Sequence, residues 1–163
     1  MERLVHLANR NNSPVAAVMI DLDHFKMLND RHGHAMGDTV LRGAATAIAG
    51  VLRQSDVACR YGGEELIVIL PDCDLDSAAA KAELLRQRIE ALSDVHGVRI
   101  TASFGVASLP ETATQANDLI AMADMALYRA KQTGRNQVVT APRRSADVAP
   151  EAAGGADALK AAE

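Results

Sequence analysis

Two pairs of carboxylates stand beside short apolar runs, and their spacing could support chemistry. Asp21 and Asp23 close the apolar run of residues 15–23, which is typical of a strand buried on both faces. Side chains two residues apart on a strand point to the same side, so this strand would present both carboxylates on one face at its carboxyl end. The alternative is that these aspartates cap the start of a following helix.

The second pair, Glu64 and Glu65, follows a Gly-Gly pair that lies between two strand-like runs. Glycine pairs in this position favour a tight β-turn, and two neighbouring glutamates behind it would point to opposite faces of the second strand. One of them would therefore face inward or along the end of the sheet. A solvated hairpin tip with two surface glutamates is the alternative interpretation.

Carboxylates brought together from the strand and the hairpin would form a set of oxygen ligands without a partnering His or Cys. Such ligands suit Mg²⁺, with Mn²⁺ as a further candidate, because one or two carboxylates hold the cation while substrate phosphates fill the remaining positions. The sequence therefore indicates phosphoryl or nucleotidyl transfer as the class of reaction.

The hydrophobic pattern indicates that helices alternate with strands around this hairpin. A turn of helix over residues 1–10 is expected to break before the first strand, and Asp38 is a candidate N-cap for the most regular helix. The expected elements are strands at 15–23, 98–109 and 137–140, a hairpin at 56–70, and helices at 24–32, 39–53, 77–93 and 115–133. This order predicts an α+β fold in which helices pack on a mixed sheet, close to the ferredoxin-like pattern.

The composition is that of one domain with a small net negative charge. With 163 residues, of which 48% are hydrophobic, the chain can bury a single core, which we place at residues 1–140. Residues 141–163 carry few large apolar side chains and are expected to form a disordered tail. A net charge of −4 and an aromatic content of 2% disfavour nucleic acid as a partner.

Three features of the sequence predict a cytoplasmic location. Cys59 and Cys73 have no metal-ligand spacing and are expected to be free thiols in a reducing compartment. No run approaches the roughly 20 apolar residues of a membrane span. The first residues also lack the pattern of a signal peptide.

Several separated blocks of the sequence together resemble the GGDEF domain, the catalytic domain of bacterial diguanylate cyclases. The resemblance covers nearly all of residues 2–139. It rests on Asp-Leu-Asp-His-Phe-Lys at 21–26, Arg-Tyr-Gly-Gly-Glu-Glu-Leu at 60–66, Ser-Phe-Gly-Val-Ala at 103–107 and Ala-Leu-Tyr-Arg-Ala-Lys-Gln-Thr-Gly-Arg-Asn at 126–136. The family implies a palm-like sheet, shared in outline with nucleotide cyclases, that joins two GTP molecules into cyclic di-GMP and releases two pyrophosphates.

The resemblance assigns the acidic residues to a metal ion. It implies that Asp21 and Glu64 bind the cation together with the backbone carbonyl of Leu22, and that Glu65 is a candidate further ligand. Glu64 is also the candidate base for the attacking 3′-hydroxyl.

The resemblance also assigns the contacts to GTP. Asn29 and Asp38 correspond to the guanine readers, and Lys26, Lys131 and Arg135 correspond to phosphate contacts. Without the resemblance, Asn29 and Asp38 would be interpreted as helix caps. Lys131 and Arg135, four residues apart, would be interpreted as cations that complement the end of a helix dipole.

Arg53 and Asp56 form an Arg-x-x-Asp pattern just upstream of the hairpin. In sequence and position this pattern matches the inhibitory site at which family members bind their own product, cyclic di-GMP. The alternative is simply a helix that ends near Arg53 and a turn that begins at Asp56.

Two features depart from the family pattern. Leu66 stands where the family has Phe, so a smaller side chain would pack beneath the hairpin and loosen the glutamates. Only residues 11–13 separate the opening Asn9 and Arg10 from Pro14, where family members usually have a full helix. These departures keep open a catalytically weak member that binds GTP or cyclic di-GMP as a regulatory module, or a domain that only dimerises.

The reaction itself sets the expected assembly. Because one domain has one GTP site and the product joins two equivalent nucleotides, two domains must face each other. The resemblance therefore implies a homodimer for catalysis, weak in the isolated chain, and a sensor domain upstream in the full-length protein.

Overall fold

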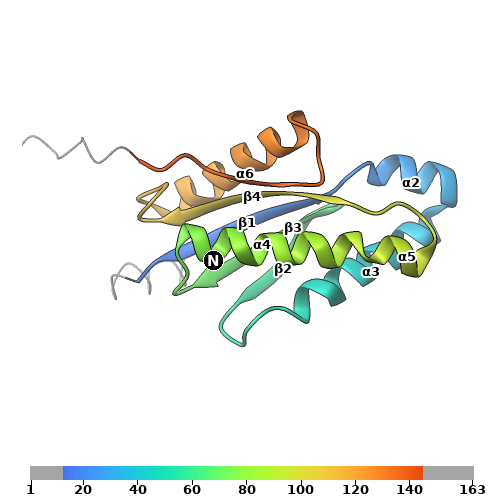
Figure 1. Ribbon diagram of the computed structural model, residues 1–163, viewed down its shortest axis with the longest axis horizontal. Coiled ribbons are helices and arrows are strands. Elements are labelled where there is room, and N and C mark those ends of the chain that lie inside the picture. Colours follow the sequence, from blue (N-terminus) through green and yellow to red (C-terminus); the bar gives the residue numbers. More distant parts are fainter. Residues whose placement is uncertain (1–12, 145–163) are drawn as a thin grey trace, which may run out of the picture.

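The computed structural model describes residues 13–144, which form a five-stranded sheet with packed helices (Figure 1). In the sheet order β2-β3-β1-β4-β5, the strands are β1 Val15–Leu22, β2 Val57–Gly62, β3 Glu65–Pro71, β4 Ala102–Leu109 and β5 Val138–Thr140. β1 pairs antiparallel with both β3 and β4, whereas β5 runs parallel to β4. The prediction of an α+β fold with a mixed, ferredoxin-like sheet is confirmed.

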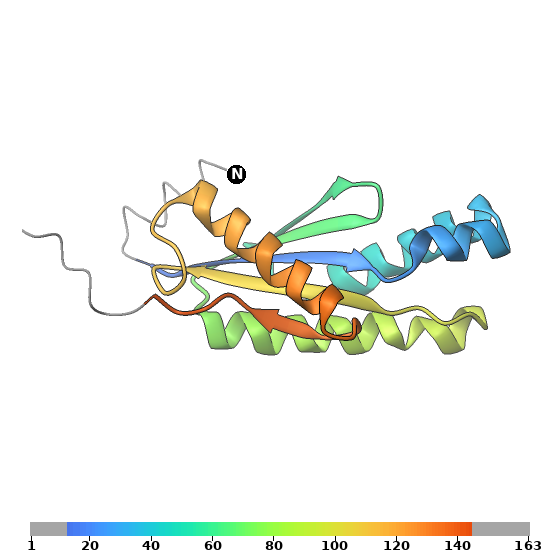
Figure 2. The ribbon, with the colours of Figure 1, turned by 90° about the horizontal axis from the view of Figure 1, so that it is seen from above.

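The central strand β1 is buried along its whole length because helices cover both faces of the sheet. Its even-numbered residues pack with α3 (His34–Ala49) and α4 (Leu75–Glu90), and its odd-numbered residues pack with α6 (Ala116–Gln132). Figure 2 shows α6 lying across β1 and β4. Cover on both faces explains why the run before Asp21 is apolar without alternation.

Helix α6 lies directly on the backbone of β4 at Gly105. A Cβ atom at this position would overlap the backbone of Ala123 and of Leu127, so the close approach requires glycine. This contact holds α6 against the sheet, together with the ion pair between Lys131 in the last turn of α6 and Asp21 of β1.

Two helices, α2 (Phe25–His32) and α3, extend beyond the carboxyl end of β1 (Figure 1). They meet at Gly33, which ends α2 and begins α3 with a φ of 83°. The helix expected at residues 39–53 therefore begins earlier, at His34, and ends at Ala49. Asp38 lies inside α3, so its interpretation as an N-cap is wrong.

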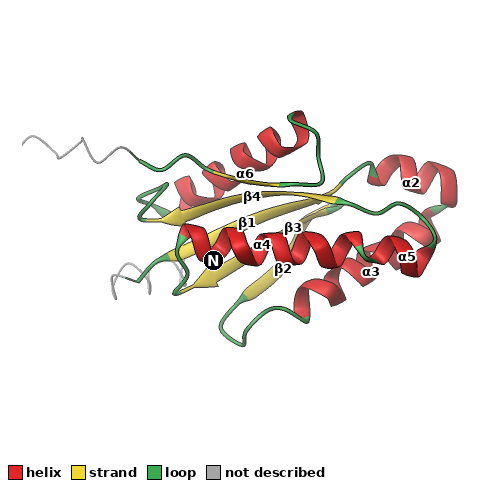
Figure 3. Cartoon of the chain, in the orientation of Figure 1, coloured by secondary structure: helices red, strands yellow, loops and turns green. Residues whose placement is uncertain are grey.

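The other helices differ from expectation at their ends. α4 begins at Leu75 because the Asp74 side chain accepts a hydrogen bond from the backbone N–H of Ser77 at 2.7 Å. The helix expected at 77–93 is divided at Ala91, and a short α5 (Leu92–His96) follows. Figure 3 shows the loop that separates α5 from β4, which begins only at Ala102. α6 and β5 match their expected ranges to within one residue.

The chain remains packed for a few residues beyond β5. Ala141 is buried, and its backbone N–H donates to the carbonyl of Val106 at 2.7 Å. Arg143 forms ion pairs with Asp76 and Glu111 at 2.8 and 3.0 Å. Residues beyond 140, where we placed the end of the domain, thus still contact the rest of the fold.

Three expectations concern regions or properties away from the sheet. The opening helix at residues 1–10 and the rest of the tail lie outside the described residues. Both cysteines are free. None of the helices between residues 13 and 144 has the length and apolar character needed to cross a membrane.

Candidate active site

The β2–β3 hairpin carries Glu64 and Glu65 at its tip. Gly62 pairs with Glu65 across the two strands, so the two-residue turn consists of Gly63 and Glu64. Gly63 has a φ of 47°, in the left-handed region that favours glycine, and its carbonyl accepts a hydrogen bond from Arg60 Nε at 2.6 Å. Glu64 therefore stands in the turn itself, and our placement of it on the second strand is wrong.

Asp21 lies near this tip at the end of β1, opposite Glu65 on one side and Ser103 on the other. The residue is 8% exposed, and its Oδ2 atom forms an ion pair with Lys131 Nζ at 2.8 Å. Burial raises the pKa of Asp21, Lys131 lowers it, and the charges of Glu64 and Glu65 raise it further. The pKa is raised on balance, so Lys131 does not fully compensate the ionised carboxylate.

The donor chemistry of this corner fits a hard divalent cation. Asp21, Glu64 and Glu65 offer only carboxylate oxygens, and such a cation would offset the excess negative charge that they create. Between residues 13 and 144, however, no three His, Cys, Asp or Glu side chains converge closely enough to hold a metal ion. The expected oxygen cage is therefore not preformed, and substrate phosphates would have to supply further ligands, as is usual for Mg²⁺.

Asn29 on α2 and Gly37 on α3 are in direct contact. A Cβ atom at Gly37 would overlap Asn29 Oδ1, which is buried and accepts no hydrogen bond within the described residues. A buried acceptor without a donor is uncommon in proteins, and a ligand donor would satisfy it. Asp38 follows Gly37 and is exposed. The two residues expected to read guanine thus lie close together where α2 and α3 meet.

Asp23 has a different environment from Asp21, although the two were expected on one face of the strand. Its carboxylate accepts hydrogen bonds from Thr101 Oγ1 at 2.8 Å, Ser103 Oγ at 2.7 Å and the backbone N–H of Asn136 at 3.0 Å. These three donors satisfy the carboxylate, which joins the ends of β1 and β4 to the loop after α6. Neither aspartate caps α2, because His24 is its N-cap residue.

The loop between α6 and β5 holds Arg135 in a fixed place. Arg135 and Asn136 have positive φ angles of 61° and 45°, which residues other than glycine rarely adopt. The side chain of Asn136 accepts a hydrogen bond from Arg86 Nη1 and donates one to Glu90 Oε1, both at 2.8 Å. Together with the bond to Asp23, these contacts maintain a strained backbone of the kind that often occurs at functional sites.

The basic residues expected to contact phosphate come from three places. Lys131 lies in the last turn of α6, whereas Arg135 lies beyond the end of that helix at Gln132, so the two do not share a helix end as expected. Lys26 is exposed in the first turn of α2. Lys131 pairs with Asp21, while Lys26 and Arg135 form no ion pair within residues 13–144.

Arg53 and Asp56 lie in the turn between α3 and β2. Asp56 Oδ2 accepts hydrogen bonds from Lys81 Nζ at 2.6 Å and from the backbone N–H of Arg53 at 2.9 Å, and the Asp56 side chain is 2% exposed. Arg53 is exposed and lines a cavity of about 630 Å³ beside α3 and β2, which Leu66 also lines. Asp56 thus orders the turn, and the Arg53 side chain faces the cavity.

The sequence did not indicate the residues that hold Asp56, Asp23 and the loop after α6 in place. Lys81 reaches Asp56 across 25 residues of sequence, and Asn136 reaches Asp23 across 113. Arg86 was also missed, because it reads as an ordinary charge on an amphipathic helix. The one available signal was that Asn136 ends the last block of the resemblance.

Comparison with known proteins identifies the family of this chain. A family model described as "Diguanylate cyclase, GGDEF domain" matches residues 1–137. This chain belongs to the GGDEF family. The response regulator PleD of Caulobacter vibrioides is 40% identical to this GGDEF chain over 144 residues, which cover 85% of the chain and 32% of PleD.

Solved GGDEF structures share the fold. The active GGEEF domain of a diguanylate cyclase from Vibrio cholerae has a TM-score of 0.81 and 33% identity, covering 88% of this chain and 92% of that one. The GGDEF domain of DgcB from Caulobacter crescentus, in complex with c-di-GMP, has a TM-score of 0.79 and 32% identity, covering 86% and 85%. Our chain spans about a third of the length of the curated relatives that it matches.

Proposed function

We propose that this GGDEF domain is a diguanylate cyclase that joins two GTP molecules into cyclic di-GMP and releases two pyrophosphates. The observation that carries the proposal is the corner at Asp21, where a buried carboxylate of raised pKa lies between the hairpin glutamates and Lys131. Such a corner suits a cation and a triphosphate bound together, because each offsets the charge of the other. Relatives named diguanylate cyclases, at 38% and 40% identity, support the same reaction.

Asp21 and Glu64 would hold Mg²⁺ or Mn²⁺, with the backbone carbonyl of Leu22 and with Glu65 as a further ligand. When bound, such a cation lowers the proton affinity of the attacking hydroxyl and offsets the charge that builds on the phosphate. Lys131 then exchanges Asp21 for a phosphate oxygen.

The residues of the chain position the phosphates and move the proton. Lys26, Lys131 and Arg135 hold the triphosphate, and Glu64 accepts the proton of the 3′-hydroxyl of the other GTP. The 3′-oxygen bonds to the α-phosphorus as the bond from that phosphorus to pyrophosphate breaks. Positioning and charge compensation supply most of the acceleration in reactions of this type.

Asn29 and Asp38 would read the guanine base. Guanine presents N–H donors on the edge that also carries its carbonyl oxygen, and adenine presents a different pattern. The unpartnered Asn29 Oδ1 and the exposed Asp38 carboxylate are both acceptors for such donors. This pairing supports GTP over ATP as the substrate.

We infer product inhibition through Arg53 and Asp56. The Arg53 guanidinium is suited to phosphate contacts, and it lines the cavity beside α3 and β2. Asp56 fixes the backbone of Arg53 by accepting its N–H.

A second function, nucleotide binding without turnover, is favoured by the ion pair on Asp21. Lys131 occupies Oδ2, and the carboxylates within residues 13–144 do not form a closed metal cage. In that case the domain would bind GTP or cyclic di-GMP as a regulatory module.

Incubation with GTP and Mg²⁺, followed by separation of the nucleotides, distinguishes the two functions. We expect cyclic di-GMP and pyrophosphate from the parent chain. Glu64→Gln should lower turnover by about 10²–10⁴-fold, the range for loss of a general base, while GTP still binds. Asp118→Asn, which removes one charge from an exposed position in the first turn of α6, is the control. GTP binding without turnover in the parent would favour the regulatory module, and full turnover in Glu64→Gln would contradict the assigned base.

A further inference from the structure

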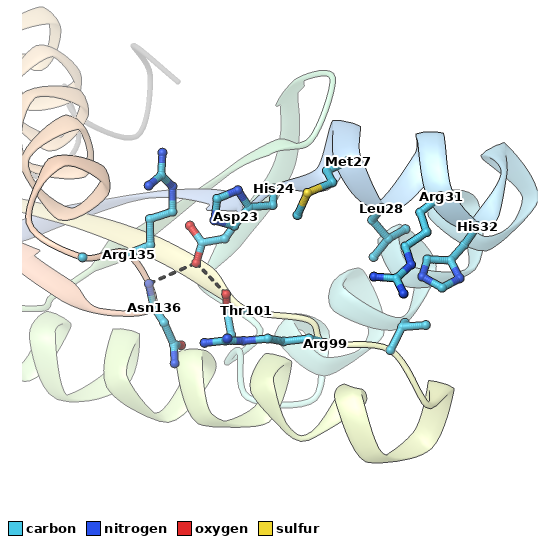
Figure 4. A pocket seen from close by; sticks show the side chains of 12 residues that line it. Asp23, His24, Met27, Leu28, Arg31, His32, Arg99, Thr101, Arg135 and Asn136 are labelled. Carbon is cyan, nitrogen blue, oxygen red and sulfur yellow. Dashed lines mark hydrogen bonds between the residues drawn. The ribbon is translucent and has the colours of Figure 1, made fainter.

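A basic groove lies on the side of α2 that faces the loops before β4 and after α6. It encloses a cavity of about 310 Å³, lined by Arg31 on α2, Arg99 before β4 and Arg135 after α6. His24 and His32 line it as well. Figure 4 shows Arg31 and Arg135 at opposite ends of the groove, with Arg99 extending past Thr101 towards Asn136.

The positive charge of this basic groove is not compensated within the described residues. Arg31, Arg99 and Arg135 form no ion pair and no side-chain hydrogen bond to any other residue between 13 and 144. Asp23 is the one carboxylate that lines the groove, and three donors already occupy it. Three arginines therefore line the cavity, and their side chains use none of their donors within the described residues.

The walls of the groove are fixed without a ligand. The loop that carries Arg99 is tied down by Ser93 Oγ, which bonds both the N–H and the carbonyl of Ile100 at 2.8 and 3.0 Å. The carbonyl of Thr101 accepts the backbone N–H of Asp23 at 2.9 Å. A site whose backbone is already in place loses less entropy when a ligand binds.

We propose that the basic groove binds a pyrophosphate group. Guanidinium forks match phosphate oxygens in pairs, and three of them along one groove require an anion with several charges and acceptor oxygens. The cavity lies at the small end of the range for ligand sites, about 300–1,000 Å³, so it suits a compact anion rather than a polymer. The group is either free pyrophosphate or the terminal part of a nucleoside triphosphate. Of the three arginines, the resemblance assigned a phosphate contact only to Arg135, and Arg31 and Arg99 extend the site away from Asp21.

Calorimetric titration of the whole chain with sodium pyrophosphate tests the proposal. Arg31→Ala and Arg99→Ala should each weaken binding at least about tenfold, equivalent to about 1.4 kcal/mol. Arg31→Lys, which keeps the charge but not the fork, should recover only part of the affinity. Arg88→Ala removes the same charge from an exposed position in the last turn of α4, outside the groove, and should leave binding unchanged. Thermal unfolding of each variant checks that the fold is intact.

Parallel titrations with GTP and GMP distinguish the two sources of the group. If the groove holds a nucleotide tail, the variants at Arg31 and Arg99 weaken GTP and pyrophosphate alike but spare GMP. If it holds the free anion, they weaken pyrophosphate alone. Absence of pyrophosphate binding in the parent chain, or equal affinity in the parent and in a variant that combines Arg31→Ala with Arg99→Ala, would overturn the proposal. The titrations contain no Mg²⁺ and measure no turnover, so their result does not depend on whether the chain is a cyclase.

Discussion

At the scale of single residues, Asp21 illustrates a conflict between folding and function. Burial raises its pKa above the usual aspartate value. Because the folded chain then binds the proton more tightly than the unfolded chain, protonated Asp21 stabilises the fold, and this contribution is complete below the pKa of the unfolded chain. It is lost as the pH rises from there through the folded pKa. The ionised form of this carboxylate therefore opposes folding, which is typical of functional rather than structural residues.

Asp21→Asn should accordingly separate stability from activity. We expect the thermal unfolding midpoint at pH 7 to stay level or rise, because a buried charge is removed and Lys131, which is 29% exposed, can be solvated. Turnover should fall at least about 10²-fold with loss of a metal ligand. Calorimetry and a cyclase assay on the same protein check both parts, and a lower midpoint with turnover retained would contradict this account.

Asp23 is expected to behave in the opposite way, because its carboxylate links two strands and a loop. Asp23→Ala should cost about 2–4 kcal/mol in the free energy of unfolding, since three donors lose their acceptor. Asp23→Asn should cost less than about 1.5 kcal/mol. Its amide oxygen keeps the bonds from Thr101 and Asn136, and its amide nitrogen donates to the Ser103 hydroxyl, which can accept. Urea unfolding measures the difference, and equal losses for the two variants would show that hydrogen bonding at Asp23 is not the cause.

At the scale of elements, the contact between α2 and α3 depends on one glycine. Gly37→Ala would place a Cβ atom onto Asn29 Oδ1 and displace the amide. We expect GTP binding to weaken about tenfold, while the higher helix propensity of alanine offsets part of the strain. Gly43→Ala, on the same helix, meets the His96 and Leu92 side chains at ordinary contact distance and should leave binding unchanged. Similar GTP affinity in both variants would contradict the proposal that Asn29 binds guanine.

The elements that could be predicted are those whose signal is local. An unbroken apolar run predicts β1, and apolar residues at helical spacing predict α6. The observed ranges of both elements agree closely with the predicted ones. The start of α3 was missed because His34 and Asp38 are polar residues that each follow a glycine. Residues 34–38 also lack the helical spacing of apolar residues that marks the rest of the helix. The turn at Glu64 was misplaced by one residue because strand register, not the glycine pair itself, decides which residues form the turn.

The residues of the candidate site could be proposed from the sequence, whereas the contacts between them could not. Asp21, Glu64, Asn29 and Asp38 occur in short blocks that can be recognised in the sequence. The ion pair between Asp21 and Lys131 joins residues far apart in the chain, and only the packing of α6 on β4 brings them together. No local pattern indicates such a pair. The positive φ angles at two residues other than glycine were equally invisible.

At the scale of the whole molecule, one domain contains one copy of the residues that we propose to bind guanine and metal. A product with two equivalent phosphodiester bonds then requires two domains in a two-fold arrangement. The described residues contain no long helix at the N-terminal end that could hold two copies together. The activity of the isolated domain should therefore depend on encounters between chains.

We expect turnover per chain to rise with protein concentration at fixed GTP. Fusing a dimerising coiled coil ahead of Met1 should raise turnover at low concentration, because it increases the effective concentration of the second domain. A coiled coil carrying substitutions that abolish its dimerisation is the matched control. Turnover per chain that is independent of dilution, in a protein shown by light scattering to be monomeric, would exclude a mechanism with two facing sites.

The bond between Lys131 and Asp21 also governs the order in which ligands can arrive. In the domain without ligands, Lys131 is the counter-ion of Asp21, because its ammonium group occupies the position at Oδ2 where a divalent cation would bind. A cation that binds alone must displace Lys131 from Asp21 and leave the lysine without an anionic partner. When a triphosphate binds as well, its oxygens can pair with the displaced lysine. Metal and nucleotide should then favour each other's binding by the same factor. Without nucleotide, a GGDEF chain of this kind would bind free divalent ions only weakly.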